Sequence, residues 1–164
     1  MPLGLRSEAM GPLFLSIILA IAFMLAGLHR GRAADAARLV PAAVLALGLQ
    51  ALHAAEEFST GFQQRAPALW GLPAWSDAFF IWLNLGAIAL WCACLAQISA
   101  GRARYPALAF LWFLALASIG NSIWHPLLAF ATGGYFPGLI TSLGMAATGT
   151  FLLRRLTERL PAAA

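Results

Sequence analysis

The sequence predicts an all-α protein, a polytopic bundle of about five transmembrane helices. Two observations lead to this fold class. Of the 164 residues, 62% are hydrophobic and only 10% are charged, with a mean hydropathy of +0.82, so the chain lacks the polar residues to coat a water-soluble core. The apolar residues also gather in long runs, which short segments containing Gly, Pro and Arg separate. We therefore expect a multi-pass membrane protein whose main partner is the lipid bilayer.

Five apolar segments are long enough, at roughly 17 to 25 residues each, to cross about 30 Å of hydrocarbon as helices. The segments are residues 10–28, 39–58, 77–98, 107–125 and 137–153. No internal repeat and no low-complexity linker divides them, so one domain over residues 1–164 is expected. Cys92 and Cys94 lie two positions apart in the third segment. A two-residue helical step points them to different sides, which favours buried small hydrophobes over a disulfide or a metal clip.

The first segment shares features with a signal peptide, because Arg6 precedes its apolar run and small residues follow it. The run is long, however, and Arg30 and Arg32 follow it at once, as at a membrane anchor. We expect this segment to remain in the protein as a helix.

The ten arginines, with no lysine in the chain, predict how the helices are oriented. Loops with many arginines stay in the cytoplasm, so the N-terminus is expected outside and the C-terminus inside. The arginines lie in short clusters between apolar runs rather than along one face, which argues against a nucleic-acid partner. On the predicted cytoplasmic side are Arg30, Arg32, Arg38, Arg102, Arg104, Arg154, Arg155 and Arg159, against Arg6 and Arg65 outside.

The second segment carries four polar residues at helical spacing: Gln50, His53, Glu56 and Glu57. Steps of three or four residues return to one face of a helix, so the histidine and both acids share a side. An ionised acid near the bilayer centre costs on the order of 2.5 to 3.5 kcal/mol, and two adjacent acids repel each other. A proton, a bound cation or hydrogen bonds from other helices would offset this cost. The alternative is that the helix ends near Phe58 and the acids are solvated at the outer interface.

The fourth segment supplies a second polar pair, Asn121 and His125, four residues apart on one face. His53 and Asn121 each lie 14 residues from the cytoplasmic start of their segments, or about 21 Å at a rise of about 1.5 Å per residue. Asn84, in the antiparallel third segment, lies about 10 Å below the outer surface and so near the same layer. Taken alone, such residues are typical of hydrogen bonds between packed helices. Their matching depth predicts one polar cluster in the outer half of the bundle.

These residues carry a resemblance to the HXXEE-domain integral membrane proteins of bacteria. The element H-x-x-E-E reads His53-Ala54-Ala55-Glu56-Glu57, N-x-x-x-H reads Asn121-Ser122-Ile123-Trp124-His125, and Y-x-P-G reads Tyr135-Phe136-Pro137-Gly138. All three occur in order between the second segment and the fifth. The resemblance implies a multi-spanning protein of the bacterial inner membrane and no established reaction. It therefore narrows the choice of site residues more than the choice of function.

The third element opens the fifth segment. Pro137 suits the first turn of a helix, where its missing N–H would have no partner, and Gly138 would let another backbone come close. Tyr135 would either donate its hydroxyl to the polar cluster or anchor at the membrane interface.

Three functions fit such a cluster. The first is a membrane-embedded enzyme on a lipid-like or otherwise apolar substrate, either metal-dependent or using one protonated and one ionised glutamate. The others are a cation- or proton-handling transporter and an accessory membrane protein, although few polar residues continue into the cytoplasmic half. Imidazole and carboxylate suit a divalent metal, zinc or iron, for which the candidate ligands are His53, Glu56, Glu57 and His125. The candidate catalytic residues are His53, Glu56, Glu57, Asn121, His125 and Tyr135.

Overall fold

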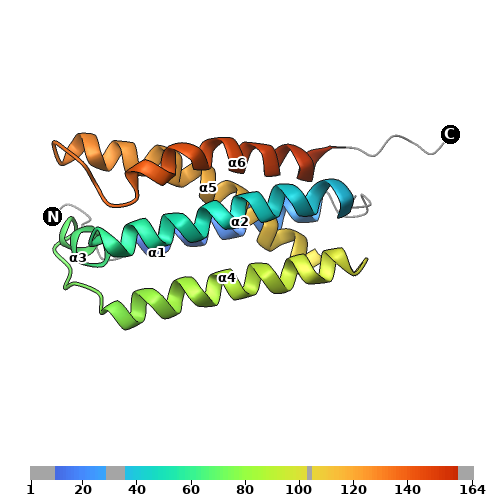
Figure 1. Cartoon of the computed structure of the whole chain (residues 1–164), viewed down its shortest axis with the longest axis horizontal. Helices are drawn as coiled ribbons and strands as arrows, with labels where there is room; N and C mark the ends of the chain where they lie inside the picture. Colours follow the sequence, from blue (N-terminus) through green and yellow to red (C-terminus); the bar gives the residue numbers. More distant parts are fainter. Residues whose placement is uncertain (1–9, 29–35, 103–104, 159–164) are drawn as a thin grey trace, which may run out of the picture.

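The computed structural model describes residues 10–28, 36–102 and 105–158, and all regular structure within these ranges is helical. Five long helices run alongside one another, and a short one lies at one end of the bundle (Figure 1). The all-α prediction is confirmed. The described helices are α1 (Met10–Leu28), α2 (Ala36–Ser59), α3 (Phe62–Ala68), α4 (Asp77–Ser99), α5 (Tyr105–Ala131) and α6 (Leu139–Thr157).

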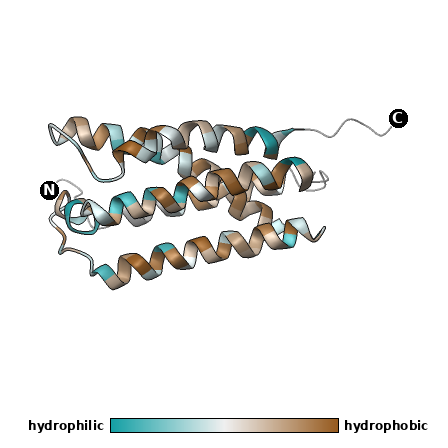
Figure 2. Cartoon of the chain, in the orientation of Figure 1, coloured by the Kyte–Doolittle hydropathy of each residue, from teal (hydrophilic) through white to brown (hydrophobic). Residues whose placement is uncertain are grey.

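The helices have the surface of a membrane protein. By length and composition, α2, α4 and α5 can cross a membrane, and Ser16–Leu28 of α1 is a shorter apolar helix. Hydrophobic residues cover much of the long helices (Figure 2). Large apolar side chains point outward, such as Trp82, which is 73% exposed, and Phe130, which is 89% exposed. Such a surface is favourable in hydrocarbon and unfavourable in water.

The number of crossings and the sides of the two termini stay predictions. Several of the arginines on which the orientation depends lie outside the described residues, namely Arg6, Arg30, Arg32, Arg104 and Arg159.

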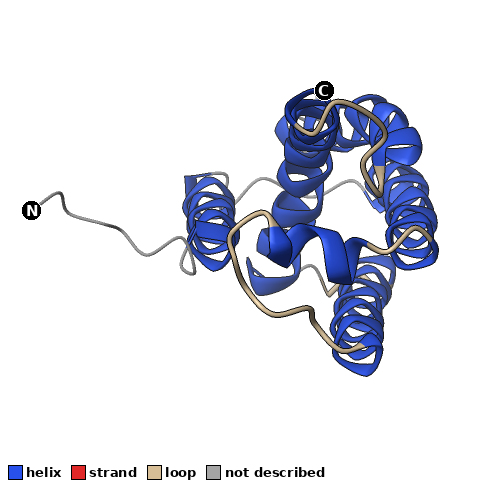
Figure 3. Cartoon of the chain, turned by 90° about the vertical axis from the view of Figure 1, so that its left-hand side faces the viewer, coloured by secondary structure: helices blue, strands red, loops and turns tan. Residues whose placement is uncertain are grey.

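The connection between α2 and α4 contains a helix, α3, where the sequence predicted only a loop. Gly61, with a left-handed φ of 85°, redirects the chain after α2, and α3 starts at the next residue. Gln63 then ties this helix to the bundle, because its side-chain nitrogen donates to Asp77 at the start of α4 over 2.9 Å. Figure 3 shows α3 lying across the end of the bundle.

The predicted end of the fourth span at His125 is wrong, because α5 continues to Ala131. Pro126 lies inside α5, and a proline inside a helix removes one backbone hydrogen bond. Tertiary packing overrides that loss: Leu128, beyond the proline, is buried with Phe136 in an apolar cluster under α3.

The fifth long helix begins two residues after the approximate start that the sequence predicted, so the predicted place of Pro137 is wrong. Pro137 is not in the first turn of a helix, because α6 begins at Leu139. Gly138 occupies the N-cap position instead, in a left-handed conformation with φ of 86° that favours glycine. This geometry matters for the site, since it turns the Pro137 carbonyl toward α5.

α5 is the central helix and contacts α1, α4 and α6, while α2 packs against α4 and α6. The approach of α5 to α6 is close at Gly149, where a Cβ atom would lie 2.9 Å from the Ala115 carbonyl oxygen. The Tyr105 hydroxyl docks α1 by donating to the Phe23 carbonyl over 2.7 Å. At the end of the bundle that α3 covers, the last turns of α2 and α5 therefore meet the first turn of α6 (Figures 1 and 3).

Candidate metal centre

Three buried side chains meet at this end of the bundle, and we call them the His–Glu centre: His53 and Glu57 from α2, and His125 from α5. The Nε2 atom of His53 lies 3.5 Å from Oε1 of Glu57, and Nε2 of His125 lies 3.4 Å from the same oxygen. One potential ligand atom from each residue lies within 4.8 Å of the other two. The exposed fractions are 0% for His53, 1% for His125 and 8% for Glu57. The structure thus gathers a His/Glu group that can hold a metal ion.

Hydrogen bonds fix which nitrogen of each imidazole carries the proton. Nδ1 of His125 lies 2.6 Å from the Pro137 carbonyl, which only accepts, so Nδ1 is the donor. Nδ1 of His53 lies 2.8 Å from the Thr141 hydroxyl, which gives its own proton to Glu56 and therefore accepts from the ring. In a neutral ring the other nitrogen then has a lone pair. Both histidines present that bare Nε2 to Glu57.

With Glu57 ionised, the His–Glu centre contains acceptors without a donor. The Nε2 atom of His53 is buried and has no hydrogen-bond partner among the described residues. The separations of 3.4 and 3.5 Å exceed the usual hydrogen-bond length of about 2.8 to 3.0 Å. They come near the edge of a tetrahedron around a zinc ion, about 3.3 Å for ligand distances of about 2.0 to 2.1 Å. A cation between the three side chains fits this chemistry and the two separations from the Glu57 oxygen.

Local structure brings each side chain of the His–Glu centre to this point. His53 and Glu57 are four residues apart on α2, so they stand one above the other on the same face. Gly138 makes room for both rings: a Cβ atom there would lie 2.6 Å from Cε1 of His125 and 2.7 Å from Cε1 of His53. The predicted close approach at this glycine is therefore made by two imidazole rings rather than by a backbone.

Glu56, a predicted metal ligand, lies outside the His–Glu centre. Its Oε1 accepts from the Tyr135 hydroxyl over 2.6 Å and from the Ile140 N–H over 2.9 Å. Its Oε2 accepts from the N–H and the hydroxyl of Thr141, over 2.7 and 2.5 Å. Neighbouring residues on a helix point about 100° apart, so only one of the two glutamates can face the histidines. Glu57 does so, and Glu56 faces the N-terminus of α6.

Tyr135 joins the network through Glu56 and does not contact the histidines in any hydrogen bond of the described residues. Its side chain is 39% exposed. Partial burial, together with the hydrogen bond to the Glu56 carboxylate, raises the pKa of Tyr135, so its hydroxyl stays a donor at neutral pH.

The amide side chains named by the sequence make no hydrogen bond to the His–Glu centre in the described part of the chain. Asn121 is half-buried one turn before His125, and it makes none of the hydrogen bonds found among the described residues of the cluster. Asn84 donates to the Phe80 carbonyl of its own helix over 3.0 Å. The Oε1 atom of Gln50, one turn inward from His53, is buried without a partner in the described part of the chain.

Sequence reasoning missed two contributors, Thr141 and the Pro137 carbonyl. A threonine in the first turn of the last helix was a weak signal, because hydroxyl residues are common in membrane helices. A backbone carbonyl carries no sequence signal at all.

Aromatic and cationic side chains cover the His–Glu centre on the side of α3. The rings of Phe62 and Phe136 lie 5.8 and 6.3 Å from the ring of His125. Arg65 of α3 donates to the Tyr135 carbonyl over 3.0 Å, and its guanidinium lies 5.2 Å from the centre of the Phe136 ring. α3 is thereby held over the histidines.

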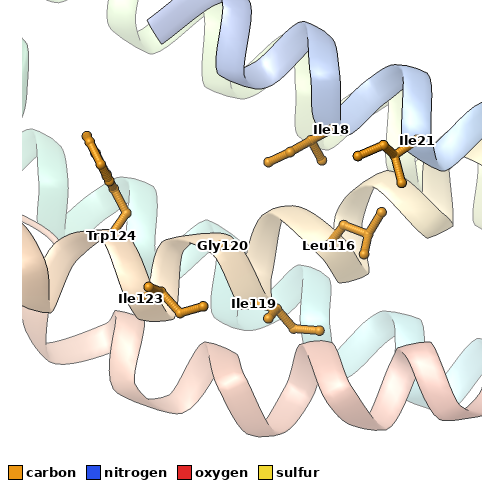
Figure 4. Close-up of a pocket in the computed structure, with 7 residues that line it drawn as sticks. All are labelled: Ile18, Ile21, Leu116, Ile119, Gly120, Ile123 and Trp124. Atoms are coloured by element: carbon orange, nitrogen blue, oxygen red, sulfur yellow. The ribbon is translucent and has the colours of Figure 1, made fainter. Parts of the chain in front are cut away.

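An apolar groove of about 340 Å³ lies between α1 and α5 (Figure 4). Its size is that of a small-molecule site, but it has almost no polar lining. Trp124, at one end of it in Figure 4, directly precedes His125 in the chain. The groove is lined by Ile18, Ile21, Leu116, Ile119, Gly120, Ile123 and Trp124.

Comparison of the chain with protein-family models, with curated proteins and with solved structures found no match. The chemistry of the site is therefore inferred from its own geometry.

Proposed function

We propose that this protein is a membrane-embedded metalloenzyme in which His53, Glu57 and His125 bind a divalent metal and act on a lipid-like, apolar substrate. The observation that carries the proposal is the pair of bare Nε2 atoms facing one carboxylate oxygen. Buried acceptors that lack a donor are costly, and a divalent cation satisfies all three at once.

The donor set favours zinc, with iron as the second choice. Two imidazoles and one carboxylate form a common catalytic zinc set, which leaves a fourth position for water or substrate. A metal at such a site supplies Lewis acidity or a metal-activated water. Each imidazole also donates its other N–H to a protein oxygen, the outer-shell arrangement that metal-binding histidines usually have.

The surroundings of the centre support an apolar substrate class. Its ligands come from helices that can span a membrane, under a cover of Phe62 and Phe136 that limits contact with water. The groove between α1 and α5 offers apolar walls to a hydrocarbon group.

We also propose that the chain is an HXXEE-domain protein of the bacterial inner membrane, with five spans, an outer N-terminus and a cytoplasmic C-terminus. Its three motif elements share one site in this proposal. H-x-x-E-E supplies His53 and Glu57, N-x-x-x-H supplies His125, and Y-x-P-G supplies the Pro137 carbonyl and the space at Gly138.

Elemental analysis of protein purified in detergent without chelators tests the proposal. The parent is expected to carry stoichiometric zinc or iron, and His125→Gln and Glu57→Gln to carry little. Glu158→Gln is the matched control, because this carboxylate pairs with Arg155 at the far end of α6. A parent that has no metal and binds neither added Zn²⁺ nor Co²⁺ would leave a metal-free acid–base site or an accessory protein as the better reading.

A further inference from the structure

We propose that Glu56 and Thr141 are positioning residues of the metal centre: the Glu56 carboxylate orients the Thr141 hydroxyl, which fixes His53 with its Nε2 toward the metal. This inference rests on the metal-binding part of the proposed function and is independent of the substrate.

The first step is the direction of a short hydrogen-bond chain. Glu56 Oε2 lies 2.5 Å from the Thr141 hydroxyl oxygen, which lies 2.8 Å from Nδ1 of His53. A threonine hydroxyl has a single proton, and a carboxylate can only accept. The hydroxyl therefore donates to Glu56 and accepts from His53. A neutral His53 must then carry its proton on Nδ1 and present Nε2 as a lone pair.

The second step is the state of Glu56. Four donors surround its two oxygens: two backbone N–H groups, the Tyr135 hydroxyl and the Thr141 hydroxyl. A carboxyl with four donors and no acceptor is in the ionised form. The partial positive charge of a helix N-terminus, here that of α6, stabilises the anion further.

The third step is that one carboxylate organises both histidines. By binding Tyr135 and the first turn of α6, Glu56 fixes the ends of segment 135–141. Within that segment lie the Pro137 carbonyl, which accepts from His125, and Gly138, which lies against both imidazole rings. Glu56 thus acts on the centre through α6, although it is adjacent to Glu57 in sequence.

Variants at Thr141 distinguish the positioning of His53 from the capping of α6 by Glu56. Thr141→Val removes the hydroxyl but keeps the branched shape and the backbone N–H that Glu56 binds, so the contact between α2 and α6 persists. Thr141→Ser keeps the hydroxyl. Thr148→Val is the control, because Thr148 is half-buried on the same helix and its hydroxyl bonds only within α6 among the described residues.

The first experiment measures Zn²⁺ affinity by competition with a chromophoric chelator, and the visible spectrum of the Co²⁺-loaded protein. Thr141→Val is expected to lose about 10- to 100-fold in affinity, the usual effect of losing an outer-shell partner, and to shift the Co²⁺ bands. Thr141→Ser and Thr148→Val should match the parent. A Thr141→Val protein with the parental affinity and spectrum would overturn the inference and leave the proposed function intact.

A second experiment requires no metal. The ¹⁵N spectrum of metal-free protein labelled at histidine distinguishes the Nδ1–H form from the Nε2–H form. His53, assigned by comparison with His53→Gln, is expected in the Nδ1–H form at neutral pH. Finding it in the Nε2–H form would overturn the inference. Failure of the parent to bind Zn²⁺ or Co²⁺, by contrast, would overturn the proposed function and with it any metal-positioning role.

Discussion

The imidazole rings of His53 and His125 meet edge to face, with centroids 4.6 Å apart and planes at 89°, and each turns its Nε2 toward Oε1 of Glu57. Each ring is held from behind by a different oxygen of segment 135–141. Two helices therefore supply the three side chains of the His–Glu centre, and the start of a third sets the orientation of the two rings.

Glu56→Gln and Glu57→Gln should have opposite effects on the metal-free protein, although the residues are neighbours. Glu56→Gln replaces an acceptor of backbone N–H groups by an amide N–H₂, and should destabilise the bundle by about 1–3 kcal/mol. Glu57→Gln removes a buried carboxylate that faces two other acceptors, and should leave stability unchanged or raise it. Thermal unfolding of both in one detergent measures this. Equal destabilisation would show that the two glutamates share one role.

Gly138→Ala should displace both histidines. The new Cβ would lie under 3.0 Å from three imidazole atoms, in a backbone region that favours glycine, so we expect weak metal binding and a stability loss of about 3 kcal/mol or more. Gly133→Ala is the control: its φ of 73° is also positive, but no atom lies within 4 Å of the added carbon. It should cost only the backbone strain, about 1–2 kcal/mol, and keep the metal. Equal metal content in the two variants would contradict the packing described here.

Zn²⁺ should stabilise the parent by mass action. At a free concentration a hundredfold above Kd, the gain is about 2.7 kcal/mol, seen as a higher melting temperature that a chelator reverses. His125→Gln should show no such shift, since it lacks one of the two imidazole ligands. A shift of equal size in that variant would place the stabilising metal elsewhere.

Arg65→Ala should loosen the cover over the centre. It removes the hydrogen bond to the Tyr135 carbonyl and the contact with the Phe136 ring, so the chelator should extract metal severalfold faster while equilibrium affinity changes little. Arg102→Ala, at an exposed position beyond the other end of α4, should extract at the parental rate. Identical rates for the two variants would mean that metal leaves by a route other than past α3.

An alkaline-phosphatase fusion after Arg155 should be inactive, because the positive charge in the last turn of α6 is expected in the cytoplasm, where that enzyme does not fold into its active form. A fusion between α3 and α4, after Gly71, should be active. The reverse pattern would invert the proposed topology.

The sequence by itself determined the all-α class, the approximate positions of the five long helices and the pairing of His53 with Glu57. These are local properties. Apolar runs of membrane length and residues four apart on one helix face depend only on composition and spacing. The depth argument also anticipated that the second and fourth segments would bring polar residues to the same level, as the distances between Glu57 and His125 show.

Only the tertiary structure decided which glutamate faces the histidines. It also decided that Thr141 and the Pro137 carbonyl hydrogen-bond to the histidines, whereas Asn121 takes no part in the described hydrogen bonds of the cluster. The spacing of residues along a helix does not determine how the helix is rotated about its own axis in the bundle. Here that rotation is set by α5 and α6 packing against α2 and by the left-handed turn at Gly138. The hydrogen bonds between α2 and α6 join residues more than 80 positions apart, and no local pattern encodes them.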